Sequence, residues 1–95
     1  MKNLSLKEKG EEKIIVDRRG EPYGCTIVMS RYSGVYSGAR WLAFPLWVSG
    51  LPKGWDGGDI ECMEFWEDYE AYGGIVGKGE TPKDAYKNLL YKLDT

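Results

Sequence analysis

The 95-residue sequence contains no histidine and only two cysteines, Cys25 and Cys62. Histidine is the usual general base near neutral pH, so a serine or cysteine nucleophile would need a lysine, a carboxylate or an N-terminal amine to activate it. No such pair stands out in the sequence. Two cysteines also do not make a disulfide framework or a structural zinc site, and both are predicted to be reduced, half-buried apolar residues. We therefore expect no catalytic residue, no cofactor and no bound metal.

Long apolar runs are also missing. No segment approaches the roughly 20 apolar residues of a membrane helix, and the start MKNLSLKEKGEEK lacks the apolar core of a signal peptide. A formal net charge of -2 and a pI near 5.1 argue against generic nucleic-acid binding. The sequence predicts a cytoplasmic protein with a mobile arm over residues 1–12 and one folded domain over residues 13–95.

Two apolar segments are typical of strands. CTIVMSRY, at residues 25–32, is rich in β-branched and apolar residues, and RWLAFPLWV, at residues 40–48, is interrupted by Pro45. Proline cannot donate to a strand ladder, so the second segment is predicted to lie at a sheet edge or to end at Pro45. KIIV, at residues 13–16, and GIVGKG, at residues 74–79, are candidates for two short strands.

A C-terminal helix is predicted to begin at Thr81, which can cap the N–H of Asp84, while Pro82 suits the first helical position. Behind this cap, apolar residues recur at helical spacing: Ala85, Tyr86, Leu89, Leu90 and Leu93. The glycines before it, in GGIVGKGE, do not have the spacing of a nucleotide-binding P-loop. The predicted fold is a small α+β domain, an antiparallel sheet with this helix packed on one face.

The segment DIECMEFWEDYE, at residues 59–70, fits a helix or a strand. A helix capped by Asp59 gathers one apolar face, formed by Cys62, Phe65, Trp66 and Tyr69. A strand would instead place Glu64 among apolar residues, so the helix fits better. Phenylalanine and tryptophan also favour strands, and both interpretations stay open.

Negative charge is concentrated in the same region. Seven of the 15 acidic residues lie at positions 56–70 with no lysine or arginine among them, and the rest of the chain holds the other eight and all 13 basic residues. Such a segment is either a solvated face or a docking surface for a basic partner. The docking interpretation assigns partner binding to Asp56, Asp59, Glu61, Glu64, Glu67, Asp68 and Trp55. Trp55 is predicted to be exposed because its loop is polar.

Aromatic residues interleaved with arginines form a second candidate site. Arg31, Tyr32, Tyr36, Arg40 and Trp47 lie in or beside predicted loops. This combination can stack and pair a nucleotide or another small ligand, which makes a ligand-binding sponge the alternative function. Core packing is the competing interpretation of the aromatic residues, and it is favoured for Trp41 and Phe44.

Two stretches, RWLAFPL and GIVGKGETPKDAYKNLLYKL, resemble the HicB-type antitoxin module. That pattern has a strand with an aromatic residue and a Phe-Pro pair, then a Gly-Thr turn and a helix beginning with an acid-Ala step. The matching residues are Trp41, Phe44, Pro45, Gly79, Thr81, Asp84, Ala85 and Asn88. The resemblance implies a partial RNase-H-like fold and a protein that blocks a toxin. The acidic segment lies in an insert between the two stretches, at residues 48–72.

In size and charge layout the chain is also similar to phage-encoded anti-defence inhibitors such as anti-CRISPRs, which would make a defence nuclease the partner. The predicted function is therefore a non-catalytic module that sequesters or inhibits a protein through that protein's basic surface. A small nucleotide and a second copy of the chain are further candidate partners, and no membrane is expected among them.

Overall fold

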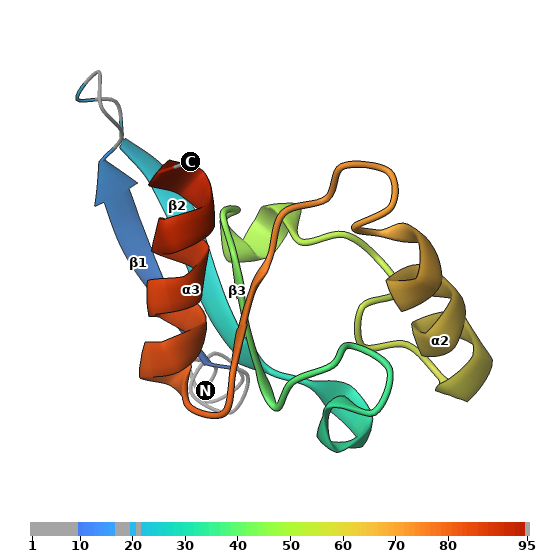
Figure 1. Ribbon diagram of the computed structural model, residues 1–95. Coiled ribbons are helices and arrows are strands. Elements are labelled where there is room, and N and C mark those ends of the chain that lie inside the picture. Colours follow the sequence, from blue (N-terminus) through green and yellow to red (C-terminus); the bar gives the residue numbers. More distant parts are fainter. Residues whose placement is uncertain (1–9, 17–19, 21, 95) are drawn as a thin grey trace, which may run out of the picture.

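The computed structural model describes residues 10–16, 20 and 22–94. Four strands, β1 (Gly10–Val16), β2 (Pro22–Met29), β3 (Trp41–Phe44) and β4 (Gly77–Gly79), form one antiparallel sheet in the order β1-β2-β3-β4. Helices α2 (Asp59–Asp68) and α3 (Pro82–Asp94) lie on opposite sides of this sheet (Figure 1). Two short 3-10 helices, η1 (Arg31–Gly34) and η2 (Val48–Gly50), lie in the connections.

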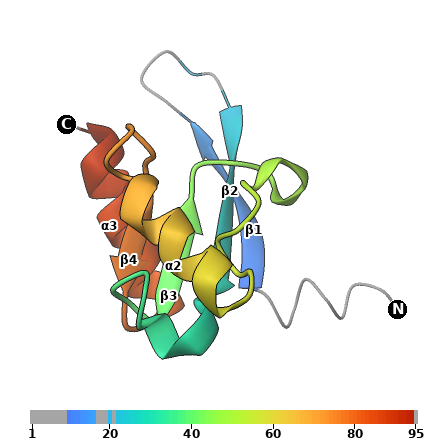
Figure 2. The ribbon, with the colours of Figure 1, turned by 90° about the vertical axis from the view of Figure 1, so that its right-hand side faces the viewer.

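The predicted α+β class is confirmed, with the C-terminal helix α3 packed on one face of the sheet. The partial RNase-H-like fold implied by the resemblance stays a prediction. Figure 2 shows α2 in front of the sheet, with α3 at the left, beside β4. Among the described residues, no helix combines the length and the apolar character needed to cross a membrane.

The central residues of strands β2 and β3 are mostly apolar, because both faces of the sheet are buried there. On the α3 side the core consists of Ile15, Cys25, Ile27, Ala43, Ala85 and Leu89. On the α2 side it consists of Val28, Leu42, Phe44, Trp55, Cys62, Trp66 and Val76. The register places Ile27 opposite Ala43 and Val28 opposite Leu42, so paired residues share a face and successive residues alternate between the two cores.

Several strand boundaries differ from the predicted ones. β2 covers Pro22–Met29 instead of residues 25–32, because residues 31–34 form the 3-10 helix η1. β1 begins at Gly10, so residues 10–12 of the predicted arm pair with β2, while residues 1–9 lie outside the described residues. β3 ends directly before Pro45, as predicted, but it is an inner strand between β2 and β4. β4 is shorter than GIVGKG, because only Gly77–Gly79 pair with β3.

Residues 59–68 form a helix, which settles the choice between helix and strand. The predicted cap is wrong: Gly58 occupies the N-cap position and Asp59 is the first helical residue. The carboxylate of Asp59 instead accepts a hydrogen bond from the hydroxyl of Tyr36. Asp59 and Glu61 still favour the helix, because their negative charges lie in its first turn, at the positive end of the helix dipole.

The helix α3 has the predicted cap. Thr81 Oγ1 accepts a hydrogen bond from the N–H of Asp84 at 3.1 Å. We expect Thr81→Ala to lower the free energy of unfolding by about 0.5–2 kcal/mol, because that N–H loses its acceptor. Urea denaturation measures the change, and Thr81→Ser, which keeps the hydroxyl, serves as the control. Equal midpoints for Thr81→Ala and the wild type would contradict the prediction.

Candidate functional site

An aromatic cluster attaches α2 to the sheet. The ring of Phe44, on β3, lies 5.9 Å from the rings of Trp55 and Tyr69 and 6.2 Å from that of Trp66, measured between centroids. Trp66 Nε1 and Cys62 Sγ both donate to the carbonyl oxygen of Trp55, at 3.2 and 3.4 Å. These contacts determine which side of α2 faces the core and which side faces solvent.

The prediction that Trp55 is exposed and contacts a partner is wrong. Its side chain is only 6% exposed, because the glycine-rich loop that carries it folds back under α2. The ring packs against Phe44, and the backbone carbonyl accepts the two hydrogen bonds from α2. Trp55 therefore positions the helix and is removed from the set of candidate partner-binding residues.

Both cysteines are free thiols in the core, more completely buried than predicted. Cys25 and Cys62 are 0% and 1% exposed. Burial raises the pKa of Cys25 to about 11, and it raises the pKa of Cys62 as well. A buried thiol with a raised pKa is a poor nucleophile. In the part of the chain that the structure describes, no three acidic or cysteine side chains are grouped so that they could hold a metal ion.

The solvent side of α2 carries what we call the acidic face, formed by Asp59, Glu61, Glu64, Glu67 and Asp68. All five residues are exposed. At about 100° per residue, Glu61, Glu64 and Glu67 lie within an arc of about 120°. Within the described ranges no ion pair involves any of the five. Five of the six predicted partner-binding acids therefore lie together on one helix.

The acid that follows the acidic face, Glu70, is already paired. Its carboxylate oxygens lie 2.6 Å from Lys78 Nζ and 3.4 Å from Lys92 Nζ. Burial alone would raise the pKa of Glu70, but the two ammonium groups outweigh burial and lower this pKa below its ordinary value. Lys78 Nζ also lies 5.7 Å from the ring centroid of Trp66. Lys78 is thus held by a carboxylate and an aromatic ring together.

The structure brings three of the five predicted ligand-binding residues to the start of the acidic segment. Arg31 Nη1 donates to two backbone carbonyls, those of Asp56 and its neighbour, at 2.9 and 3.0 Å. Its guanidinium lies 4.9 Å from the ring centroid of Tyr32. The hydrogen bond from Tyr36 to Asp59 raises the pKa of the Tyr36 hydroxyl. These residues brace the loop before α2, which also leaves Asp56 only partly exposed.

The other two predicted ligand-binding residues lie elsewhere. Arg40 Nε lies 3.9 Å from the carboxylate of Glu80, beside β4. Trp47 lies over Gly24, where an added Cβ would come within 2.2 Å of the indole ring. Gly24 lies near the beginning of β2, where β2 pairs with the end of β1. Arg40 lies at the other end of β2: it directly precedes β3, and its carbonyl accepts a hydrogen bond from the N–H of Ser30, just after β2. Arg31, Arg40 and Trp47 therefore do not line one pocket.

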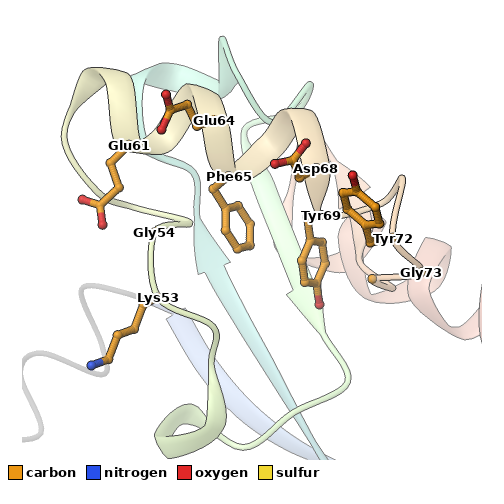
Figure 3. A pocket seen from close by; sticks show the side chains of 10 residues that line it. Lys53, Gly54, Glu61, Glu64, Phe65, Asp68, Tyr69, Tyr72 and Gly73 are labelled. Carbon is orange, nitrogen blue, oxygen red and sulfur yellow. The ribbon is translucent and has the colours of Figure 1, made fainter.

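A groove, which we call the aromatic groove, runs along α2 beside the acidic face (Figure 3). It has a volume of about 620 Å³ and is open to solvent. Its floor contains the stacked rings of Phe65 and Tyr69, with centroids 4.9 Å apart and planes at 22°. Three acids, Glu61, Glu64 and Asp68, line the same groove, with Tyr72 at one end and Lys53 opposite the helix.

Tyr72 and Lys53 were not among the predicted site residues. A signal for Tyr72 is present in the sequence as two rows with a spacing of four residues: Glu61, Phe65 and Tyr69 in one, and Glu64, Asp68 and Tyr72 in the other. Residues four apart are neighbours on a helix surface, so each row places acids beside rings. The chain continues the helical course as far as Tyr72, whose N–H donates to the carbonyl of Asp68 at 3.0 Å.

The comparisons with known proteins give no assignment. No protein-family model, no curated protein and no solved structure matches this chain significantly.

Proposed function

We propose that the chain is a non-catalytic binding module of the cytoplasm, which sequesters or inhibits a partner protein by docking the acidic face of α2 on a basic surface. The observation that supports this most is the acidic face itself, five exposed carboxylates without an ion pair among the described residues. The HicB-type resemblance makes a toxin an expected partner. The similarity in size and charge layout to anti-defence inhibitors makes a defence nuclease the other.

Rigid support of the acidic face favours a docking role. Cys62 and Trp66 are held in the core by the carbonyl of Trp55, and Arg31 braces the loop that leads into the helix. Carboxylates displayed on an element that is ordered before binding lose less conformational entropy when the partner arrives. The nucleotide alternative is less favoured, because Arg31 already bonds to backbone carbonyls and lies beside Asp56, whose negative charge repels phosphate.

Charge reversal on α2 tests the proposed function. We expect the triple variant Glu61→Lys/Glu64→Lys/Glu67→Lys to lose the basic proteins that the wild type captures from its native cells. With a partner purified in this way, wild-type binding should weaken as salt rises from about 50 to about 300 mM. The association rate should fall most, because exposed charges are screened over about 8 Å at physiological salt. Capture with quantitative mass spectrometry and stopped-flow kinetics measure the two effects.

A matched pair of single reversals controls for net charge. Glu64→Lys should slow association, whereas Glu80→Lys, an exposed acid that pairs with Arg40, should not. Circular dichroism establishes that every variant is folded. If the triple variant binds normally while Tyr32→Ala or Arg40→Ala abolishes binding, the acidic face is only a solvated surface and the ligand-binding alternative is favoured.

A further inference from the structure

We propose that the aromatic groove binds an arginine side chain of the partner protein. This inference rests on the proposed function, because it names the group by which the acidic face would recognise its partner. Two features favour this occupant. The groove combines partly exposed aromatic rings with carboxylates that form no ion pair among the described residues. In addition, Trp66 of α2 and Glu70, just after α2, already hold a lysine of the same chain.

The groove has the two components that bind an organic cation. Phe65 and Tyr69 form a partly exposed, stacked floor, and Tyr72, at 85% exposed, stands at its end. Ring faces attract a cation within about 6 Å of their centroids. Glu64 and Asp68 line the same groove as the rings, and a carboxylate can accept charge-assisted hydrogen bonds from a cation. An apolar ligand would leave these carboxylates without a counter-charge.

Charge in the groove favours a cation over an anion. Three carboxylates line it, and the one basic residue among the lining residues is Lys53. In Figure 3 the ammonium group of Lys53 points away from Phe65 and Tyr69, so it leaves the space over the rings unoccupied. A phosphate or a carboxylate entering this space would meet like charges on the helix side.

The molecule already uses this chemistry within its own chain. Lys78 Nζ lies 5.7 Å from the ring centroid of Trp66 and 2.6 Å from a carboxylate oxygen of Glu70, so one cation contacts a ring and an acid of the same region. Arg31 lies over the ring of Tyr32 at 4.9 Å. The aromatic groove offers the same pair of groups, but no cation of the described chain fills it.

Arginine suits the groove better than lysine. Its guanidinium is planar and more weakly hydrated than an ammonium group, so it can stack on an outward-facing ring of the groove at a lower desolvation cost. Its five N–H donors also allow it to bond to a rim carboxylate while it stacks. A partner with an exposed arginine in a basic surface therefore fits both the acidic face and the groove.

The test uses defined peptides and the full chain, so it does not depend on knowing the partner. The probe is the capped tripeptide acetyl-Gly-Arg-Gly-amide, titrated into ¹⁵N-labelled protein, with peptides carrying lysine or the uncharged isostere citrulline for comparison. We expect the arginine peptide to shift the amide signals of residues 61–74 and the side-chain signals of Tyr72. The lysine peptide should bind more weakly and the citrulline peptide should cause no shifts.

Variants locate the binding groups. Tyr72→Ala and Asp68→Asn should each weaken binding of the arginine peptide about threefold, the loss expected for one exposed cation–ring or charge contact. Glu67→Gln removes an acid of the same helix that does not line the groove, and Tyr91→Ala removes an exposed tyrosine on α3; neither should change the dissociation constant. All four side chains are exposed, so folding is retained.

The proposal is overturned if the citrulline peptide causes the same shifts, if lysine binds as tightly as arginine, or if Glu67→Gln weakens binding as much as Asp68→Asn. Its failure is distinguishable from failure of the proposed function. If the triple charge reversal abolishes partner binding but Tyr72→Ala changes binding of neither the partner nor the peptide, the proposed function stands and the arginine site in the groove is refuted. Normal partner binding by the triple variant would refute the proposed function.

Discussion

Gly77→Ala should destabilise the domain by about 3 kcal/mol or more, at the upper end of the range for inserting a methyl group into a packed core. β4 passes so close to α3 that a Cβ at Gly77 would come 2.2 Å from the carbonyl oxygen of Ala85 and 2.5 Å from the backbone nitrogen of Leu89. Both are backbone atoms, so no side-chain rotation relieves the clash and the helix itself must move. Thermal and urea unfolding followed by circular dichroism measure the loss.

Gly50→Ala is the matched control for this substitution. An added Cβ at Gly50 meets nothing within 4 Å, and the residue does not have a positive φ. The free energy of unfolding of the Gly50→Ala variant should therefore stay within about 0.5 kcal/mol of the wild-type value. A wild-type unfolding midpoint for Gly77→Ala would show that β4 does not pack against α3 as described.

Phe44→Ala should lower the free energy of unfolding by about 3–5 kcal/mol, the usual cost of truncating a buried phenylalanine. The side chain is 0% exposed and contacts Trp55, Trp66 and Tyr69, so its loss leaves a cavity between β3 and α2. Because these rings attach α2 to the sheet, near-ultraviolet circular dichroism should weaken together with stability. Phe44→Leu refills most of the volume and should cost less.

The same variant links the core to the aromatic groove. If α2 is positioned by the aromatic cluster, any folded fraction of Phe44→Ala should bind the arginine peptide more weakly than the wild type, although Phe44 does not line the aromatic groove. If Phe44→Ala lowers the free energy of unfolding by less than about 1 kcal/mol, Phe44 is not the centre of the packing between β3 and α2. A well-packed core does not close such a cavity fully enough to remove most of the cost.

Features that depend on residues close together in the chain were predictable from the sequence. The Thr81 cap forms as predicted, because the hydroxyl and the N–H that it satisfies are three residues apart. The phase of α2 was also predictable: Cys62 and Trp66 are buried while Glu61 and Glu64 are exposed, as helical periodicity requires. The segments of β2 and β3, rich in apolar and β-branched residues, marked both as strands, and Pro45 ended the second.

Features that depend on contacts between distant segments were decided only by the tertiary structure. The polar, glycine-rich surroundings of Trp55 indicated exposure, but its loop folds back onto Phe44 of β3 and buries the ring. Likewise, Arg31 and the carbonyl of Asp56 are 25 residues apart, and composition alone could not show that they bond to each other. Local patterns report which side of an element is apolar. Which segment covers that side depends on long-range packing, so the aromatic groove beside α2 became visible only in the folded chain.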